Sequence, residues 1–448
     1  MPRHPHLLRH ARPEELTPGQ RFAIAMAFAL AWVALSLWLA MPWIDDLDRL
    51  LGPVPGWAAV IGVALLPGYL NAHLLASIVL ARFPPLPDPH EIEFPPISVL
   101  VAAYNEEDEI ARSVELILEQ DYPGDLEVVV IDDGSTDATA DIVRTIAEAG
   151  RSVRLLQPGH GGKTTALNHG LEAAEAPLVA TVDADTHLAP GSLRRLVTRF
   201  LVSDPETLAV AGAVFVSNPE DSLLAREQNW DYFLGIATIK REQAMLLGTL
   251  VAQGAFSVYD TAGLRKVGGW PDAIGEDIVL TWRLLEGGGN VGYESTALAF
   301  TEVPTTLGAF FRQRRRWARG MIEGLRTSGW ALLRKHKLYS HSVFVDCLLP
   351  YIDFSYCVFF LPGVVLALTG NFAIVGPMTL AVLPLNLLMA GAMMSRQRRA
   401  FRAAGLAPPP VRHNLGGLLT YLGFYQVIGS PISVSGYVLE LVRAPRRW

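Results

Sequence analysis

Apolar and polar positions divide this chain into two apolar ends around a more polar middle. Residues 22–43 contain no charged side chain, and a second apolar tract covers residues 57–79 after one short acidic loop. A helix needs about 20 apolar residues to cross a hydrocarbon core of about 30 Å. The pattern therefore predicts two transmembrane helices within residues 22–82. A cleavable signal peptide is the alternative for the first tract, but the second tract favours two anchors.

Apolar tracts resume near the other end of the chain, at residues 343–368, 372–394 and 415–441. They predict about three transmembrane or re-entrant segments within residues 343–442. Pro431 and several glycines interrupt the last tract, so a re-entrant or interfacial segment is an alternative to a full span there.

The distribution of arginines predicts the orientation of these segments. The N-terminal tail, residues 1–21, is basic and carries Arg3, Arg9, Arg12 and Arg21. The loop after the first tract instead holds Arg49 among three aspartates. Because cytoplasmic loops carry an excess of Lys and Arg, the tail and the middle region should be cytoplasmic. Four arginines within residues 396–402 agree, but five full spans would place the basic tail 443–448 outside, so the topology of the last tract stays open.

The middle region alternates β-branched runs with helix-like segments from residue 97 to residue 334. A stiff, proline-rich connector separates it from the second apolar tract. The strand-like runs are residues 97–102, 127–131, 153–157, 178–182 and 209–216. This alternation predicts an α/β domain with a mostly parallel sheet, inserted between transmembrane helices.

Composition agrees with this division. The chain has 448 residues, of which 50% are hydrophobic, and a formal net charge of −7. That apolar share is too high for an ordinary soluble enzyme, and the length fits two or three structural units. Because the arginines cluster beside the apolar tracts, we expect a lipid bilayer and no nucleic acid among the partners.

Acidic residues follow two of the predicted strands. Asp132 and Asp133 end one run, and Asp183 and Asp185 end another. The carboxyl ends of strands form the edge where open α/β sheets bind ligands, and Asp183 and Asp185 point to the same side if the chain there is extended. Their hard oxygens suit Mg²⁺ or Mn²⁺ bridging a diphosphate, although a simple turn explains either motif alone.

Residues 159–164, Gly-His-Gly-Gly-Lys-Thr, look like the end of a phosphate-binding P-loop. That motif requires a glycine at position 157, where this chain has Gln157. We therefore reject a P-loop and predict that Lys163 is a cation on the donor side of a site. The alternative is a solvated loop lysine.

A basic and aromatic cluster, residues 312–317, precedes the third apolar tract. In a helix, Gln313, Arg316 and Trp317 share one face at i, i+3 and i+4. Arg316 would then clamp a diphosphate with its forked guanidinium, and Trp317 would offer an apolar platform to a sugar. An interfacial helix with arginines on lipid headgroups is the alternative. We assign the first role to these three residues and the second to the other arginines, namely Arg312, Arg314, Arg315 and Arg319.

Two aspartates, Asp346 and Asp353, lie in the third apolar tract about two helical turns apart, hence on one face. Carboxylates inside a membrane are costly unless they face protein or water. Three interpretations of these aspartates stay open. They line a hydrophilic conduit, they pair with other polar groups of the protein, or they lie at the membrane interface where the span begins.

Six motifs occur in the order found in membrane-embedded family 2 glycosyltransferases. The motifs are Tyr104-Asn105-Glu106, Asp133-Gly134-Ser135, Gly162-Lys163, Asp183-Ala184-Asp185, Gly275-Glu276-Asp277 and Gln313-x-x-Arg316-Trp317. The chain thus resembles the processive synthases of cellulose, chitin, hyaluronan and poly-N-acetylglucosamine. The resemblance implies a GT-A fold, which is a Rossmann-like α/β domain, a UDP-sugar donor, Mg²⁺ or Mn²⁺, and inversion at the anomeric carbon.

The resemblance also implies roles for single residues. The residues expected to bind the donor are Tyr104, Glu106, Asp133, Lys163, Asp183, Gln313 and Arg316, with Asp133 on the uracil side. Asp185 and Asp183 are expected to bind the metal ion. Trp317 and Gln253 are expected to contact the acceptor sugar. Asp277, with Glu276 beside it, would be the catalytic base, since an inverting transfer needs one group that takes the proton of the acceptor hydroxyl. Paired acids are also common as first-turn charges of a helix. Gly275 replaces the threonine that often precedes these acids in the family.

Other features resemble the bacterial poly-β-1,6-N-acetylglucosamine synthases most. These are residues 235–243, the two-plus-three apolar tracts and the arginine-rich tail. The resemblance implies polymerisation of N-acetylglucosamine from UDP-GlcNAc, coupled to export of the growing biofilm polysaccharide across the bacterial inner membrane. It also implies a small two-span membrane subunit and cyclic di-GMP regulation. A chitin, hyaluronan or cellulose type synthase is the near alternative. A polyprenyl-phosphate glycosyltransferase is farther, because such enzymes usually lack Gln-x-x-Arg-Trp.

Overall fold

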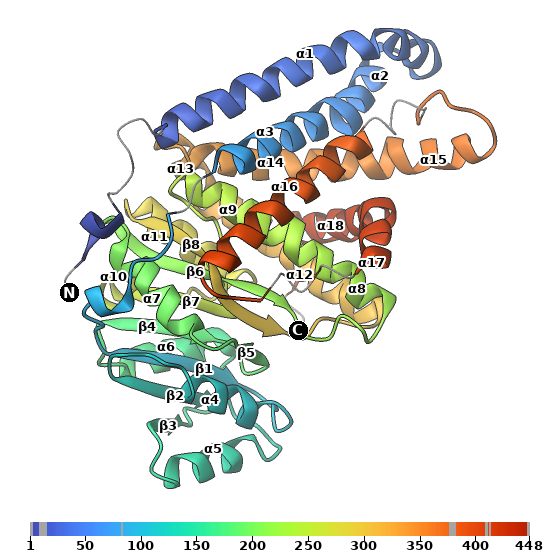
Figure 1. Ribbon diagram of the computed structural model, residues 1–448. Coiled ribbons are helices and arrows are strands. Elements are labelled where there is room, and N and C mark those ends of the chain that lie inside the picture. Colours follow the sequence, from blue (N-terminus) through green and yellow to red (C-terminus); the bar gives the residue numbers. More distant parts are fainter. Residues whose placement is uncertain are drawn as a thin grey trace.

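The computed structural model describes residues 3–8, 16–81, 84–375, 382–407, 411 and 414–445. It consists of a sheet domain with a layer of long apolar helices along one side (Figure 1). Three predicted segments lie partly outside the described residues, namely the basic tails 1–21 and 443–448 and the apolar tract 372–394.

One eight-stranded mixed sheet forms the centre of the domain. Its strands are β1 (Ile97–Ala103), β2 (Leu126–Asp132), β3 (Val153–Leu156), β4 (Leu178–Val182), β5 (Thr186–Leu188), β6 (Thr207–Val216), β7 (Phe256–Asp260) and β8 (Asn290–Thr301). The order is β3-β2-β1-β4-β7-β6-β8-β5. The pairs β1–β2, β2–β3, β1–β4 and β6–β8 are parallel, whereas β7 is antiparallel to β4 and β6, and β5 is antiparallel to β8. All five predicted strands are present, and β5, β7 and β8 are additional.

Helices cover both faces of the sheet. One face packs against α4 (Ile110–Leu118), α5 (Thr139–Glu148) and α7 (Ser192–Val202), and the other against α6 (Lys163–Ala173), α10 (Thr261–Lys266) and α11 (Glu276–Glu286). Within β1, Val99 and Val101 belong to the first core while Leu100 belongs to the second. This period of two is expected for a strand buried on both sides. The α/β prediction is therefore confirmed.

Within the part of the chain that the structure describes, three helices are long and apolar enough, by length and composition, to cross a membrane. They are α1 (Pro18–Leu51), the continuous run of α2 (Pro53–Val60), η2 (Ile61–Leu65) and α3 (Leu66–Leu80), and the run of α14 (Ser340–Ser355), η6 (Tyr356–Phe360) and α15 (Leu361–Leu368). Thr17 caps α1 through reciprocal hydrogen bonds with Gln20. Both predicted N-terminal spans and the first C-terminal tract thus fold as such helices.

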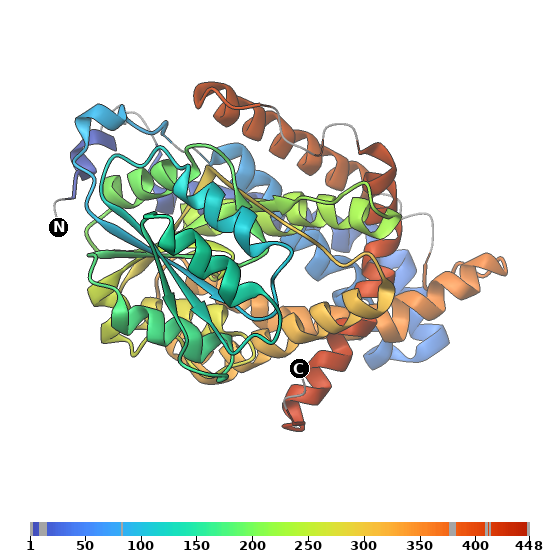
Figure 2. The same cartoon turned by 90° about the horizontal axis from the view of Figure 1, so that it is seen from below.

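The last apolar tract, residues 415–441, packs against other helices of the protein. Residues 415–441 are helical throughout, as α17 (Leu415–Thr420), η9 (Tyr421–Tyr425) and α18 (Gln426–Leu441). α18 crosses and packs on α12 (Leu307–Gly324), as Figure 2 shows, and also contacts α14. Gly436 allows this close approach, because a Cβ there would lie 2.7 Å from the Cβ of Ala318.

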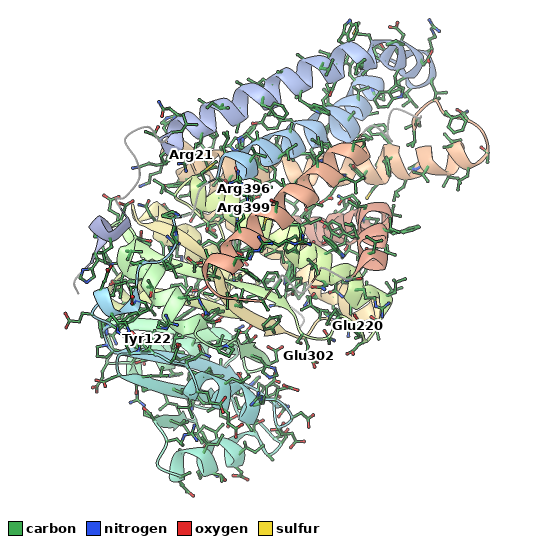
Figure 3. All side chains as sticks on the ribbon, viewed as in Figure 1. Arg21, Tyr122, Glu220, Glu302, Arg396 and Arg399 are labelled. Carbon is green, nitrogen blue, oxygen red and sulfur yellow. The ribbon has the colours of Figure 1, made fainter. Side chains whose placement is uncertain are left out.

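The remaining helices connect these layers. They are η1 (Pro5–Leu8), η3 (Pro89–Glu91), α8 (Leu223–Trp230), η4 (Asp231–Ala237), α9 (Thr238–Met245), η5 (Leu325–Gly329), α13 (Trp330–Arg334) and α16 (Val382–Ala403). Figure 3 shows Arg21, Arg396 and Arg399 where the apolar helices meet the sheet domain, and Glu220 and Glu302 farther from those helices. Basic side chains therefore lie at this boundary.

Candidate active site

A cavity of about 240 Å³ opens at the carboxyl ends of β1 and β4. Six residues that the motifs predict line it, together with three alanines: Tyr104, Glu106, Asp133, Lys163, Asp183 and Asp185. Parallel strands that share a register end at one edge, so motifs far apart in sequence meet there.

The acidic side of the cavity holds Glu106, Asp183 and Asp185. The chain at Asp183 and Asp185 is not extended, because β4 ends at Val182, as predicted, and the amide of Thr186 donates to the Asp183 carbonyl at 3.0 Å, which closes a turn. Burial, and then Asp185 and Asp183, raise the pKa of Glu106 to about 7. Burial and Asp183 likewise raise the pKa of Asp185. Crowded carboxylates with raised pKa values fit a divalent cation with hard oxygen ligands, since the ion relieves their repulsion.

Lys163 faces these acids from the first turn of α6. Its Nζ lies 2.5 Å from Asp183 Oδ1 and 4.0 Å from Glu276 Oε1. Burial alone lowers the pKa of Lys163, but Asp183 and Glu276 outweigh it and raise the pKa. Gly254 also approaches closely, because a Cβ there would lie 3.2 Å from Nζ. The lysine is therefore a fixed cation between the acidic cluster and the start of α11.

The loop before Lys163 is pinned to Asp133. The amides of Gly161 and Gly162 donate to its carboxylate at 2.8 and 2.9 Å, and His160 Nδ1 lies 3.1 Å from Asp133 Oδ2. The His160 ring lies against Tyr104 with centroids 5.0 Å apart. Sequence reasoning did not select His160, although its place in the Gly-His-Gly-Gly-Lys motif was a signal.

Glu276 and Asp277 begin α11, and Glu276 lies 4.0 Å from Lys163, which lines the cavity. Burial and then Asp277 raise the pKa of Glu276 to about 7, against the opposing charges of Lys163 and Arg316. Lys240 lies nearby and is a residue that no motif indicated. Its Nζ donates to the Val251 carbonyl at 2.9 Å, and burial lowers its pKa to about 7 although Asp277 opposes this.

The helix α12 carries the predicted face of Gln313, Arg316 and Trp317. Arg316 is exposed, and its charge acts on both Lys163 and Glu276, so it lies on the cavity side. Trp317 is half-buried beside Tyr232, with ring centroids 6.4 Å apart. Gln313 Oε1 is buried without a hydrogen-bond partner.

Two other arginines of this helix correct the sequence interpretation. Arg314 is buried, pairs with Asp231 at 2.8 Å, and places its guanidinium 4.1 Å from the centre of the Trp317 ring. Arg319 is also buried and lies 3.2 Å from Glu440. They are not lipid contacts, because η4 and α18 cover the face of α12 that was expected to meet the bilayer. Arg314 instead holds Trp317 in place through a cation–π contact.

Two glycines join the start of α11 to α12. A Cβ on Gly275 would lie 2.7 Å from the Cα of Gly320, so the two backbones touch. Glu323 accepts hydrogen bonds from the amides of Ile274 and Gly275 at 2.7 and 3.4 Å. The glycine in place of the threonine thus has a physical reason, since this packing leaves no room for a side chain.

Gln253 and Asp353 have structural partners. Gln253 Nε2 donates to the carbonyls of Gly212 and Phe256 at 2.7 and 3.3 Å, which shapes the loop next to Gly254. Asp353 accepts from Gln426, Ser430 and Tyr437 at 3.0, 2.7 and 2.7 Å. Of the three interpretations of Asp353, structural pairing is the one that these contacts match.

Comparisons with known proteins give the family. Residues 95–320, just over half of the chain, match the family described as "Glycosyltransferase like family 2". Poly-β-1,6-N-acetyl-D-glucosamine synthase of Staphylococcus epidermidis is 32% identical over 243 residues, which are 54% of this chain and 58% of that protein. The synthase of Staphylococcus aureus strain MSSA476 is 33% identical over 240 residues, 53% of this chain and 58% of that protein.

A solved structure is similar in fold. The mannosyltransferase PcManGT from Pyrobaculum calidifontis, in complex with GDP-Man and Mn²⁺, has a TM-score of 0.59 at 22% identity, covering 88% of this chain and 100% of that chain. This likeness supports the GT-A-like fold. Since the family match spans more than half of the residues, the chain belongs to glycosyltransferase-like family 2 and is a sugar-transferring enzyme.

Proposed function

We propose that this protein polymerises N-acetylglucosamine from UDP-GlcNAc with inversion, and passes the growing poly-β-1,6-N-acetylglucosamine across the bacterial inner membrane. The observation that carries the proposal is the cavity where the donor and metal motifs meet beside Arg316, Glu276 and Asp277. The names of the two Staphylococcus relatives support the choice of polymer. The match spans about three-fifths of each relative.

The donor would lie in the cavity with its uracil near Tyr104, His160 and Asp133. Tyr104 is 47% exposed at the cavity, so its ring is available for stacking on a base. Lys163 and Arg316 would neutralise the diphosphate, and Arg316 has the forked geometry that suits phosphate oxygens. Asp183 and Asp185, with Glu106 close to them, would hold Mg²⁺ or Mn²⁺, which supplies positive charge at the diphosphate.

The acceptor would approach between Trp317 and the start of α11. Trp317 offers an apolar face, which Arg314 holds from behind, and the loop of Gln253 borders Lys163 through Gly254. Asp277 would take the proton of the acceptor hydroxyl as the anomeric carbon is attacked, and one such base is enough for inversion. Glu276 would keep Lys163 oriented.

The membrane part of the proposal assigns spans to α1, to the run α2–α3 and to the run α14–α15. Their length and apolarity support a multi-pass protein with the sheet domain in the cytoplasm. The packing of α18 on α12 supports an interfacial rather than a spanning course for residues 415–441. The small two-span subunit and cyclic di-GMP regulation stay predictions from the resemblance.

Donor competition and product digestion test this function. The full-length protein in lipid nanodiscs is incubated with radiolabelled UDP-GlcNAc alone, with UDP-GlcNAc plus UDP-glucuronate, and with UDP-glucose. We expect polymer from UDP-GlcNAc alone, resistant to chitinase and hyaluronidase and degraded by a β-1,6-N-acetylglucosaminidase. A polymer that chitinase degrades would instead establish a chitin synthase. A requirement for UDP-glucuronate would establish a hyaluronan synthase, and polymer from UDP-glucose a cellulose synthase. A single labelled sugar on a polyprenyl phosphate would establish the farther one.

A further inference from the structure

Two histidines and a glutamate from three helices meet between the apolar helices and the sheet domain. His73 lies on α3, Glu242 on α9 and His341 on α14, and one ligand atom of each lies within 4.8 Å of the other two. His73 is 3% exposed and Glu242 7% exposed. The ends of α3 and α14 nearest to the sheet domain lie beside α9 in Figure 1. None of the three residues lines the cavity or belongs to the six glycosyltransferase motifs, although Glu242 lies in residues 235–243.

Three polar atoms of this cluster lack the hydrogen bonds that burial requires. His73 Nε2, His341 Nδ1 and Glu242 Oε1 are buried without a partner. Among the described residues, no Lys or Arg nitrogen lies within 4 Å of the Glu242 carboxylate, and His73 Nδ1 lies 3.5 Å from it. A buried carboxylate without a cation and imidazole nitrogens without a donor are both unfavourable. One cation within the cluster would bind one ligand atom of each side chain and neutralise the carboxylate.

Tyr69 lies at the outer ring nitrogen of His341. The Tyr69 hydroxyl lies 3.3 Å from Met26 Sδ and 2.8 Å from His341 Nε2. When the hydroxyl donates to Met26 Sδ, the tautomer of His341 with its proton on Nε2 donates to the hydroxyl oxygen. Nδ1, the atom without a partner, then has a free lone pair. A hydrogen bond on the far nitrogen is also what orients histidines that bind metals.

We propose that His73, Glu242 and His341 bind a Zn²⁺ ion that ties the helices α3 and α14 to α9. Zinc takes imidazole nitrogens and carboxylate oxygens at about 2.0–2.2 Å, with a fourth position for water or another ligand. Bonds of that length place neighbouring ligand atoms about 3.5 Å apart, so the side chains close by about 1 Å around the ion. Phe22 encloses the cluster, with its ring centroid 5.7 Å from that of His73 and 5.3 Å from that of His341.

The ligands distinguish this ion from the one at the cavity. Asp183, Asp185 and Glu106 offer carboxylate oxygens, which suit Mg²⁺ or Mn²⁺, whereas imidazole nitrogens favour zinc. The position also suggests what the ion does. α9 leads into the loop that carries Gln253, so a tie between α9 and the apolar helices holds that loop at a fixed distance from them.

Zinc content tests the proposal. Full-length protein, purified with a tag that contains no histidine, is stripped with chelator, loaded with ZnCl₂, desalted and measured by plasma mass spectrometry. We expect about one zinc per chain in the wild type, and a loss of most of it in His73→Gln and in His341→Gln. Asp185→Asn should keep its zinc because it changes only the cavity. His169→Gln, an exposed histidine on α6, is the matched control and should also keep it.

Thermal unfolding gives a second measurement. Zn²⁺ should raise the Tm of stripped wild-type protein, because a ligand that binds the folded state stabilises it, and should not raise the Tm of the two histidine variants. If those variants do not fold, the Asp185→Asn variant is loaded with Co²⁺ and its visible absorption is measured. A tetrahedral Co²⁺ site absorbs visible light, and this variant lacks a proposed metal ligand of the cavity, so absorption would indicate Co²⁺ bound at the histidine cluster. Wild-type protein that retains no zinc and shows no change in Tm overturns the proposal, as does zinc retained in both histidine variants or a Co²⁺-loaded chain without this absorption.

Discussion

Adding one methyl group at Gly275 should separate the proposed catalytic acids, Glu276 and Asp277, from the helix that carries Arg316 and Trp317. In the variant Gly275→Ala, the new Cβ would lie 2.7 Å from the Cα of Gly320 and 3.1 Å from its carbonyl carbon. Two carbon atoms rest about 3.5–4.0 Å apart, so α11 and α12 must move apart by about 1 Å. Both contacts are with backbone atoms, and therefore no side-chain rotation relieves them.

The size of the effect follows from this displacement. Overpacking of this kind costs about 1–3 kcal/mol of folding stability. A shift of about 1 Å in a positioning group lowers the rate of an enzyme by as much as about 100-fold, which is about 2.7 kcal/mol of activation free energy. We expect a 10- to 100-fold slower polymerisation. UDP binding should weaken less than the rate, because Tyr104 and Asp133 lie on other elements and only Arg316 of the proposed donor ligands moves with α12.

Polymer formation from labelled UDP-GlcNAc in nanodiscs, with calorimetric UDP binding and Tm on the same samples, measures both effects. Gly308→Ala is the matched control on the same helix, since its Cβ would meet only a guanidinium nitrogen of Arg312 at 3.7 Å. Gly320→Ala should reproduce the loss, because its Cβ would lie 2.8 Å from the Cα of Gly275 in the same contact. A wild-type rate in Gly275→Ala, or an equal loss in Gly308→Ala, would refute the reasoning.

Four further predictions concern the chemistry. Asp277→Asn should abolish polymer formation and leave UDP binding nearly unchanged, because only the base is lost; normal polymer yield in purified membranes contradicts the assignment. Trp317→Ala should shorten the polymer, measured by gel filtration, more than it weakens donor binding, and a loss of donor affinity alone would exclude the acceptor role. EDTA should stop sugar transfer, and adding back Mg²⁺ or Mn²⁺ should restore it. The Asp185→Asn variant should need a higher metal concentration for the same rate. Full activity in the presence of chelator counts against a metal site. Because the pKa of Glu276 is raised to about 7, the acid pair keeps a proton below that pH and loses it above. The rate should therefore rise as the pH increases through 7, and Glu276→Gln should remove this dependence, whereas an unchanged pH profile in that variant would disprove it.

The strands that the sequence predicts are those with continuous β-branched runs. β1, β2, β3, β4 and β6 begin and end within a few residues of their predicted bounds. β7 is only five residues long and β5 only three, which is too short for a periodic signal. β8 contains Gly292 and polar side chains, and pairs with β6 across register shifts, so its alternation is broken.

The site was predictable where chemistry follows a strand end, and less so where packing between distant segments decides. Motif order alone identified all six predicted residues that line the cavity. The burial of Arg314 depends on Asp231, and that of Arg319 depends on Glu440, more than a hundred residues away in the chain. Helical periodicity places Arg314 on a face of α12, but it does not say which element covers that face.

The helix α12 connects the chemistry of the site to the apolar helices. It carries Arg316 and Trp317, and its Gly320 touches Gly275, which precedes Glu276 and Asp277. Its Arg319 binds Glu440 of α18. An α-helix of 18 residues with buried, closely packed faces moves as one body. Any shift of α18 and its neighbour α14 against α12 must therefore move Arg316 and Trp317 relative to Lys163. The proposed coupling of synthesis to export needs no additional moving part, because α12, which would contact the substrates, packs on α18, and α18 contacts α14, one of the proposed spans.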